Sequence, residues 1–448
     1  MSKIIDAVSI VMTCGDEIFA IQRQFYLKAF PGYWSFPGGK VDPGDESFSL
    51  THEITKDLDP RLLGAAVREG QEELGIDLRE EIKNGTVRSI HCLGLAVTPD
   101  FNPYRFATYF FKVDFKKKVN FIVDENEARI AKWMSAENLL SEFNKGQILA
   151  VPPTIKVIET LGRDPETTAI EDLNVIYDGE EFVPCIESLK GMPQIMALSH
   201  TLPPATRTNS FLIGDAGSPR LLIDPSPKDD EEYRKFKNTV MSMGADKILI
   251  THHHPDHYER SNQLARELNL PVLLSAYTLE RIIREDKDYF AGIEIEIIKE
   301  NDCVTRWLTH DVLVMEVPGH DEGQVALYSR DLSWFLAGDL FQGIGTVVIG
   351  GEAGNMKKYF QTLEKIIELS PKILFPSHGI GLGGTYILEK TLEHRKLREE
   401  QILNCFKRGL SEEEMLAEIY VDVRKDLWPY ALENIQKHLE KLKADGKC

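Results

Sequence analysis

Residues 247–257 read KILITHHHPDH, an apolar run that ends in a cluster of histidines with one aspartate. A short apolar run of this kind predicts a buried strand, and the polar residues after it then lie at the strand's end. Within the cluster, His252, His254, Asp256 and His257 form the pattern H-x-H-x-D-H. Imidazole and carboxylate groups are the ligands that zinc and neighbouring first-row ions prefer. The cluster therefore predicts a metal site at a strand end.

Three more ligand-type residues follow along the chain, each after an apolar, strand-like run. They are His320 in VPGH, Asp339 in LAGD and His378 in FPSHG. A single loop histidine is more often solvated or bonded to nearby backbone, so no one of these residues carries the prediction. Together with the first cluster they indicate two metals roughly 3.5–4 Å apart, which is the arrangement of two-metal hydrolytic sites. His253, inside the cluster, is not assigned to a metal.

The order of these residues resembles the metallo-β-lactamase superfamily, whose fold is a four-layer αββα sandwich. The resemblance implies two zinc ions, or other first-row divalent ions, with a bridging water of lowered pKa as the nucleophile. It divides the ligands between the ions: His252, His254 and His320 on one metal, Asp256, His257 and His378 on the other, and Asp339 bridging. In this scheme Asp256 is also catalytic, because it orients the nucleophile. Asp224 in LLIDPS matches an early aspartate of the family that supports the ligands.

The resemblance extends over roughly residues 190–448. Its further segments are RTNSFLIG (207–214), LAGDLFQGIGTVVI (336–349), EHRKLREEQIL (393–403) and the stretch 419–447. These look like the lactamase-B-like endoribonucleases of mitochondria and their bacterial relatives, which have a small winged-helix-like tail. The resemblance implies a binuclear phosphodiesterase that cleaves single-stranded RNA.

A second group of chemically informative residues lies in the first third of the chain. The sequence FPGG ends in Gly38 and Gly39, and after an insertion Glu69, Glu72 and Glu73 follow at helical spacing i, i+3 and i+4. Three carboxylates on one helix face repel each other, and Mg²⁺ or Mn²⁺ would relieve the repulsion and bridge substrate phosphates. An acidic helix face is more often only solvated. The two glycines favour the metal hypothesis, because they permit close backbone approach to a diphosphate.

This loop and helix resemble the Nudix box of hydrolases that split nucleoside diphosphates linked to another moiety. The resemblance implies an α/β/α sandwich, with Glu69, Glu72 and Glu73 as metal ligands, the last two also as catalytic residues, and Gly38 and Gly39 as the binding loop. Arg68, before the first glutamate, is expected to be an ion-pair partner.

The Nudix-like box departs from the family pattern at three points. Asp45 stands where the first glutamate is usual, Gly70 occupies a usually bulky position, and 22 residues rather than seven separate Asp45 from Arg68. A long insertion, together with Lys28-x3-Gly32-x3-FPGG, resembles the Nudix branch that acts on coenzyme A and its esters.

The length of 448 residues predicts several domains, since an ordinary domain has about 150 residues. We expect an α+β multidomain chain with four parts: a Nudix-like domain at 1–165, an acid-rich linker at 166–189, a lactamase-like domain at 190–390 and a winged-helix-like, α-rich tail at 391–448.

The formal net charge is −19, which argues against duplex DNA as a partner, because non-specific duplex binding depends on neutralising many phosphates. No apolar run reaches the roughly 18 residues of a membrane span. We therefore expect no membrane partner and a cytoplasmic location, and the sequence leaves a homodimer open.

Three functions remain open at this point. The first is an endoribonuclease on single-stranded RNA, for which a local track of Arg395, Lys396, Arg398, Arg424 and Lys425 in the tail is available; for any one of these residues, ordinary helix-surface charge is at least as good an interpretation. The second is coenzyme A ester metabolism, with Nudix cleavage of the diphosphate and lactamase-type hydrolysis of the thioester. The third is a catalytically inactive Nudix fold that binds a nucleotide and regulates the hydrolase.

Overall fold

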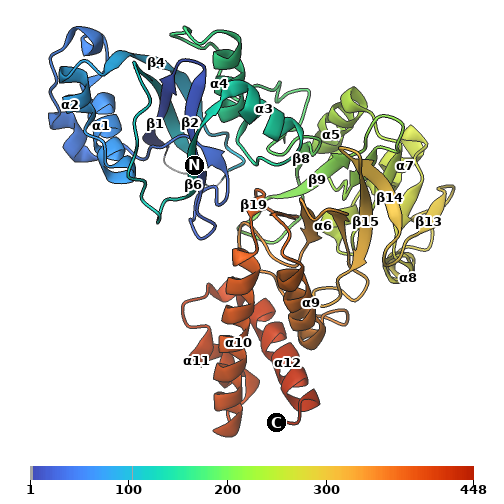
Figure 1. Ribbon diagram of the computed structural model, residues 1–448. Helices are drawn as coiled ribbons and strands as arrows, with labels where there is room; N and C mark the ends of the chain where they lie inside the picture. Colours follow the sequence, from blue (N-terminus) through green and yellow to red (C-terminus); the bar gives the residue numbers. More distant parts are fainter. Residues whose placement is uncertain (1–3, 103) are drawn as a thin grey trace. The chain divides into compact units, whose positions relative to one another are not determined.

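The computed structural model describes residues 4–102 and 104–448, which form two compact units. The N-terminal unit comprises the chain up to Asp178 with Ile186–Lys190, and the C-terminal unit comprises Gly179–Cys185 with Gly191–Cys448 (Figure 1). The acid-rich segment 166–189 is divided between them. Leu173 packs in the core of the first unit and Val183 in that of the second. The domain boundaries expected from the sequence stay predictions.

A six-stranded mixed sheet runs through the N-terminal unit. Its order is β3-β2-β1-β5-β4, with β6 paired to β2, and β1 is parallel to β5. Alternate residues of β1 face opposite sides, so Ile10 and Met12 pack in one core cluster and Val11 in another. The strands are β1 (Ile5–Cys14), β2 (Glu17–Arg23), β3 (Trp34–Ser35), β4 (Val87–Val97), β5 (Phe106–Phe115) and β6 (Ala128–Ser135).

Helices cover both faces of this sheet. Leu62 and Leu78 join the cluster of Ile10, whereas Leu139 and Ile158 join that of Val11. The unit is therefore an α/β/α sandwich, which confirms the expected fold. The helices on the first face are α1 (Pro60–Leu74) and α2 (Leu78–Lys83), and those on the second are α3 (Ala136–Asn144) and α4 (Pro152–Arg163).

The insertion between Asp45 and Arg68 folds against the core of the N-terminal unit. It contains the 3-10 turns η1 (Pro43–Ser47, in part) and η2 (Glu53–Thr55) and the first turns of α1. The Asp59 side chain caps α1 by accepting a hydrogen bond from the Arg61 amide. Phe48 and Leu58 pack on the core, and the last residues of the insertion form the first turns of the helix that carries the three glutamates.

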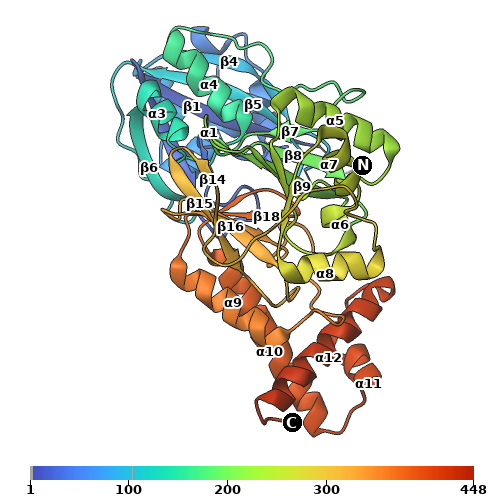
Figure 2. The same ribbon diagram turned by 90° about the vertical axis from the view of Figure 1, so that its right-hand side faces the viewer.

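Two sheets form the centre of the C-terminal unit (Figure 2). The first has the order β13-β12-β11-β10-β9-β8-β7 and the second β14-β15-β16-β17-β18-β19. The strands of the first sheet are β7 (Cys185–Ile186), β8 (Gln194–Leu198), β9 (Arg207–Ile213), β10 (Leu221–Ile223), β11 (Lys247–Leu249), β12 (Val272–Leu274) and β13 (Ile295–Ile297). Those of the second are β14 (Cys303–Trp307), β15 (His310–Glu316), β16 (Val325–Ser329), β17 (Phe335–Gly338), β18 (Ile373–Pro376) and β19 (Leu382–Gly383).

Helices pack on the outer face of each sheet. Phe236 and Ile282 join Leu222 in the core of the first sheet, and Tyr359 joins Phe335 in that of the second. The αββα sandwich expected from the sequence is thus confirmed. The helices between the strands are α5 (Asp230–Met243), α6 (Pro255–Tyr258), α7 (Ser261–Leu268), α8 (Ala276–Glu285) and α9 (Met356–Leu369).

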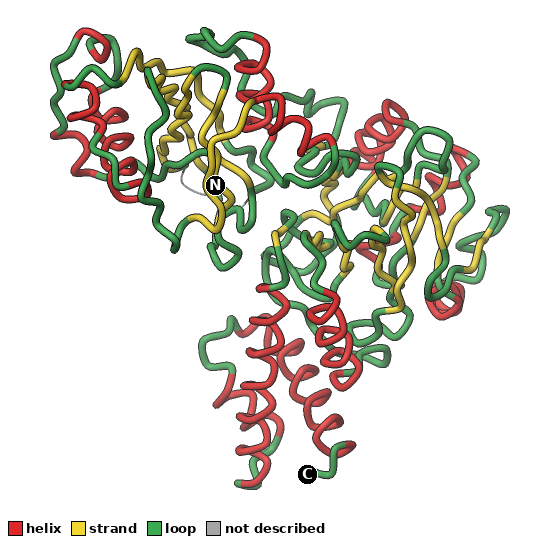
Figure 3. The backbone as a smooth tube through the Cα atoms, in the orientation of Figure 1, coloured by secondary structure: helices red, strands yellow, loops and turns green. Residues whose placement is uncertain are grey.

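The C-terminal tail is built from helices, as Figure 3 shows. It consists of α10 (Tyr386–Lys407), α11 (Glu412–Ile419), the turn η3 (Lys425–Leu427) and α12 (Trp428–Ala444). Ile402, Leu416 and Ile435 meet in a small core of its own. The tail is α-rich as expected, and α10 runs without a break across residues 390–391. Across the described ranges 4–102 and 104–448, no helix is long and apolar enough to cross a membrane.

Candidate functional site

The ligand-type residues of the C-terminal unit converge from the ends of separate strands. The H-x-H-x-D-H cluster follows β11, His320 follows β15, Asp339 follows β17 and His378 follows β18. All seven belong to groups whose ligand atoms lie within 4.8 Å of one another. These groups are His252 with His254 and His320, His252 with His257 and Asp339, and Asp256 with His257 and His378.

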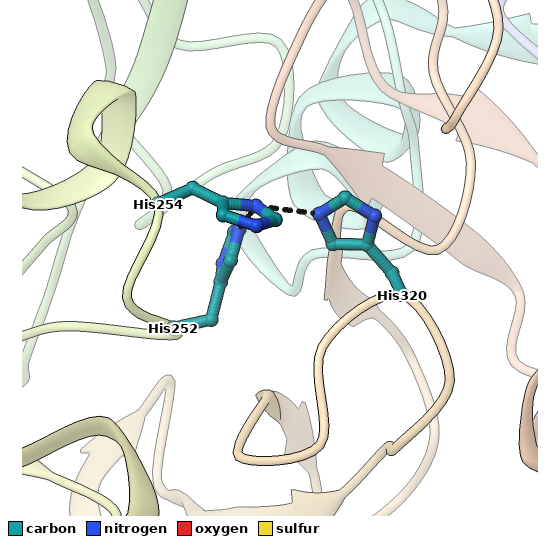
Figure 4. Close-up of side chains that lie close together, drawn as sticks. All are labelled: His252, His254 and His320. Atoms are coloured by element: carbon teal, nitrogen blue, oxygen red, sulfur yellow. Dashed lines mark hydrogen bonds between the residues drawn. The ribbon is translucent and has the colours of Figure 1, made fainter. Parts of the chain in front are cut away.

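The first group is a triad of histidines that face one another (Figure 4). His254 Nδ1 lies 3.0 Å from His252 Nε2 and 2.9 Å from His320 Nε2. Two imidazole nitrogens at 2.0–2.1 Å from a tetrahedral zinc ion would be about 3.3 Å apart. The spacing of the triad is therefore close to that of a three-nitrogen metal site.

The second group centres on two further histidines and two carboxylates. His378 Nε2 lies 3.5 Å from Asp256 Oδ2, and His257 Nε2 lies 3.8 Å from the same oxygen. Asp339 Oδ1 is 3.5 Å from both of these imidazole nitrogens, and its Oδ2 is 3.7 Å from His320 Nε2. Asp339 thus presents one oxygen to each group, the geometry expected of a bridging carboxylate.

The outer nitrogens of three of these histidines are held by hydrogen-bond acceptors. His320 Nδ1 donates to the Val348 carbonyl and His378 Nδ1 to the Arg207 carbonyl, both at 2.8 Å. His257 Nδ1 donates to Asp224 at 2.9 Å. A carbonyl oxygen can only accept, so Nδ1 of His320 and of His378 carries a proton, and their Nε2 atoms face the site.

Asp224, directly after β10, binds both His257 and Thr251, the residue that precedes the first histidine of the cluster. Its Oδ1 accepts from the Thr251 amide at 2.8 Å, and its Oδ2 accepts from Thr251 Oγ1 at 2.7 Å as well as from His257. Thr251 in turn lies 3.0 Å from His252 Nδ1. Sequence reasoning found Asp224 but missed Thr251, whose only signal is a hydroxyl directly before the first histidine.

Replacement of Asp224 with asparagine is expected to weaken zinc binding about 10–100-fold, the usual effect of losing a ligand's supporting partner. The amide has one acceptor oxygen, so its NH₂ group must face either the Thr251 amide, which now binds Oδ1, or the Thr251 hydroxyl and His257, which now bind Oδ2. Equilibrium dialysis against zinc measures the change, with Asp230→Asn as a control because that side chain is 94% exposed. Unchanged affinity in Asp224→Asn would contradict the supporting role.

Burial and neighbouring charges set the protonation of the site. Burial lowers the pKa of His252 well below its usual range and that of His254 to about 3, so both imidazoles are neutral. Burial would also lower the pKa of His257, but the nearby Asp256 and Asp339 carboxylates outweigh it and raise that pKa. In the metal-free site, therefore, the carboxylates of Asp256 and Asp339 stabilise the protonated form of His257.

Two atoms in the centre of the site have no hydrogen-bond partner. They are His257 Nε2 and Asp339 Oδ1, both fully buried. An unpaired buried polar atom costs about 1–3 kcal/mol, more when it belongs to a charged group. A divalent cation would satisfy both atoms, so the donor set fits the metal that the residue pattern predicts.

His253 and Asp321 form an additional pair beside the triad. The two side chains are in contact through Nδ1 and Oδ2, and with His254 they make a further group within 4.8 Å. Asp321 also accepts from the Gly323 amide at 2.7 Å, which orders the loop after His320. Sequence reasoning missed Asp321, although it directly follows the histidine of PGH.

The glycine loop and the carboxylates of α1 meet in the N-terminal unit. The Gly38 amide donates to Glu73 Oε2 at 2.9 Å. A Cβ at Gly39 would lie 2.3 Å from Glu69 Oε1, so the glycine leaves room for this carboxylate against the loop. Burial raises the pKa of Glu73 to about 8 and also raises that of Glu69. Glu72 is more exposed, and among the described residues the three carboxylates form no group within 4.8 Å.

Arg68 holds the Nudix-like carboxylates in this arrangement. Its Nη1 donates to Glu69 at 2.7 Å and to Glu72 at 3.0 Å. Its Nε and Nη2 each lie 3.1 Å from a carboxylate oxygen of Asp45. The aspartate that replaces the usual glutamate therefore pairs with the arginine, which agrees with the ion-pair role expected for Arg68.

The basic residues of the tail do not all face solvent. Arg395 is 3% exposed, so its assignment to an RNA-contacting track is wrong. Lys396 pairs with Glu364 at 2.8 Å, and Arg424 pairs with Asp426 at 2.6 Å. Arg398 donates to the Ile419 carbonyl inside the tail.

Comparison with known protein families accounts for most of the chain. The NUDIX domain family matches residues 3–152, the metallo-beta-lactamase superfamily matches residues 203–378, and the beta-lactamase associated winged helix domain matches residues 411–448. These three ranges contain the carboxylate helix, all the ligand-type histidines and the last two helices of the tail.

Individual relatives resemble the C-terminal unit. The "Beta-lactamase-like protein 2 homolog" of Drosophila melanogaster is 29% identical over 250 residues, which are 54% of this chain and 83% of that protein. A hydroxyacylglutathione hydrolase of Bdellovibrio bacteriovorus is 30% identical over 129 residues, 28% of this chain and 46% of that protein. A beta-lactamase domain protein of Burkholderia ambifaria shares the fold, with a TM-score of 0.52 and 17% identity over 60% of this chain and 91% of that one.

The matched domains and the converging ligand-type residues lead to one assignment. The chain is a metal-dependent hydrolase that joins an N-terminal NUDIX domain to a metallo-β-lactamase superfamily domain with its associated winged helix.

Proposed function

We propose that the seven ligand-type residues of the C-terminal unit hold two first-row divalent ions, with zinc as the first choice for this histidine-rich set. The observation that carries the proposal is that His257 Nε2 and Asp339 Oδ1, both buried, lie 3.5 Å apart without a hydrogen bond at the point where the two groups meet. When bound, the ions would supply Lewis acidity toward the substrate oxygen and activation of a water molecule.

The protein's own residues would divide the remaining work. His320, His378 and His257 keep their Nε2 lone pairs inward because their Nδ1 protons are held by fixed acceptors. Asp256 has the side chain most open to solvent among the carboxylates of the site, at 15% against 7% for Asp339. It is therefore placed to accept a hydrogen bond from an entering water and to receive its proton at the carboxylate.

For the substrate we infer an acyl thioester of the coenzyme A type. The molecule would carry both bonds that the two domains are suited to hydrolyse, a diphosphate for the NUDIX domain and a thioester for the C-terminal site. The Bdellovibrio relative is named as a hydrolase of an acylated thiol, hydroxyacylglutathione. Arg395 is buried and offers no charge to RNA, whereas Lys396 and Arg424 stay exposed in surface ion pairs.

A substrate panel tests this inference. The full chain is incubated with acyl-coenzyme A, acylglutathione, nucleoside diphosphate derivatives and single-stranded RNA, and thiol release is followed by a colorimetric thiol reagent. We expect thiol release in the wild type and in Glu73→Gln, and its loss in His254→Ala. No thiol release from any acyl thioester would contradict the assignment.

Single-stranded RNA is the second candidate, favoured by the tail's match to a winged helix domain. RNA cleavage by the wild type that disappears in His254→Ala, with no thiol release, would select this candidate instead.

The NUDIX site is proposed to hold Mg²⁺ or Mn²⁺ on Glu69, Glu72 and Glu73 and to split a diphosphate. A cytoplasmic location and a homodimer stay predictions.

A further inference from the structure

The buried Arg395 of α10 lies where the helical tail meets the metallo-β-lactamase domain. Its Nη1 donates to Asn434 Oδ1 on α12 at 2.9 Å, and its Nη2 donates to the Val347 carbonyl. The guanidinium carbon lies 5.8 Å from the ring centroid of Tyr359 on α9. A buried guanidinium needs such partners, because an unpaired buried charge is strongly destabilising. Arg395 thus connects three helices to one loop.

That loop, residues 347–351, also supports a predicted metal ligand. The carbonyl of Val348, its second residue, accepts the hydrogen bond from His320 Nδ1. The neighbours of Val348 on both sides are fixed by the tail, since Val347 is held by Arg395 and the Ile349 amide donates to Asn434 Oδ1 at 3.1 Å. The carbonyl that orients His320 is therefore positioned by two side chains of the tail.

The end of the loop is attached to the tail as well. The Gly351 amide donates to Glu433 Oε2 on α12 at 3.0 Å. A Cβ at Gly350 would lie 1.8 Å from the same oxygen, so the glycine lets Glu433 approach the backbone. The backbone groups of Val347, Ile349 and Gly351 are thus hydrogen-bonded to side chains of α10 and α12.

Tyr359 carries a second connection from Arg395 to the site. Its hydroxyl donates to the Leu340 carbonyl at 2.5 Å, and Leu340 directly follows Asp339. Its backbone also packs against Gly319, which precedes His320: a Cβ there would lie 2.3 Å from Tyr359 Cα. The arginine therefore packs on the residue that holds the loops of both His320 and Asp339.

We propose that Arg395 and Asn434 are positioning residues, through which the helical tail sets the orientation of His320 and with it the metal affinity of the histidine triad. The inference rests on the two-metal site proposed above. The imidazole needs its Nδ1 proton on a fixed acceptor to keep the Nε2 lone pair in the site, and losing such a partner typically weakens metal binding about 10–100-fold. The tail thus acts on the metal site without contacting substrate.

The test compares cobalt binding by the metal-free full chain in the wild type, Arg395→Met and Asn434→Ala. Asn434→Ala removes the oxygen shared by Arg395 and Ile349 while it keeps the buried guanidinium. We expect the wild type to bind two ions and both variants to lose roughly tenfold or more in affinity for one of them, with the other unchanged. Visible absorption follows the binding, and ¹⁵N chemical shifts of the His320 ring report a changed tautomer population.

Arg398→Met is the matched control. Arg398 lies one turn further along α10, donates to the Ile419 carbonyl and packs on Tyr420 at 4.6 Å, and both of these partners belong to the tail. The midpoint of thermal unfolding measures how much stability each substitution removes, separately from its effect on metal affinity. The proposal is overturned if Arg395→Met and Asn434→Ala bind both ions as the wild type does, or lose no more affinity than Arg398→Met. A wild type that fails to bind two ions would instead reject the metal site itself.

Discussion

Asp339→Ala is expected to reduce hydrolysis by the C-terminal site about 10³-fold or more and to lower the metal content from two ions to at most one per chain. The side chain presents Oδ1 to His257 and His378 at 3.5 Å and Oδ2 to His320 at 3.7 Å. Removing it leaves both groups without their shared anion. Loss of several kcal/mol of charge stabilisation in the transition state corresponds to roughly a thousandfold in rate.

The measurement pairs turnover with metal analysis of the purified full chain. Asp311→Ala is the control, because Asp311 is a partly exposed aspartate of the same unit that pairs with Arg330 at 3.0 Å on the surface. Asp339 also places a negative charge among buried imidazoles, and the pKa values of His257 and His378 are raised by it. Without the carboxylate both imidazoles should titrate at lower pH. Retention of two ions with full activity in Asp339→Ala would refute the bridging assignment.

The ligand-type residues were predictable because strand ends are strong local signals. A buried strand must be followed by a turn, and a polar residue directly after an apolar run such as 248–250 lies at the edge of a sheet. The order of seven such residues then specified one metal-binding pattern, and the structure brings all of them together. Asp321 and Thr251 were missed because each is an ordinary loop or strand-end residue whose importance depends on what lies opposite in the fold.

Arg395 illustrates a different failure. Along α10 the buried residues Leu388, Leu392, Arg395, Glu399 and Ile402 follow one another at spacings of three and four. This periodicity is that of a buried helix face, so the sequence does contain the signal that Arg395 points inward. Charge alone suggested exposure, because a single buried arginine is uncommon unless it is paired. Its partners, Asn434 and the Val347 carbonyl, are distant in sequence and could not be read from it.

Asp45 shows how a departure from a motif acquires a physical reason. The sequence shows only that an aspartate stands where a glutamate is usual. In the structure its side chain is 6% exposed and binds Arg68 through both oxygens, and the same arginine holds Glu69 and Glu72. The substitution therefore preserves an ion-pair network around the carboxylate helix. For the NUDIX site to be catalytic, a divalent cation must replace Arg68 as the partner of Glu69 and Glu72; if Arg68 stays bound, the domain is only a binding fold.

Glu73→Gln distinguishes these two outcomes. The variant is expected to lower diphosphate hydrolysis at least about 10²-fold, because the glutamine cannot supply the anionic oxygen that a divalent ion requires. Thiol release at the C-terminal site should be unchanged. Glu80→Gln on α2 is the control, since Glu80 is a half-exposed glutamate that pairs with Lys83 at 2.9 Å. Turnover of every substrate as in the wild type would instead identify the NUDIX domain as a nucleotide-binding regulator.

The pH dependence of Mg²⁺ binding provides an independent measurement on the same residue. Burial raises the pKa of Glu73 to about 8, so below that pH the carboxyl group is mostly protonated in the metal-free protein. Cation binding then displaces one proton. The apparent affinity should rise about tenfold per pH unit up to roughly pH 8 and level off above it.

Calorimetric titrations between about pH 6 and 9, in buffers of different ionisation enthalpy, measure both the affinity and the released proton. In Glu73→Gln the proton release should vanish, whereas a wild-type affinity that does not change with pH would show that the cation binds without Glu73.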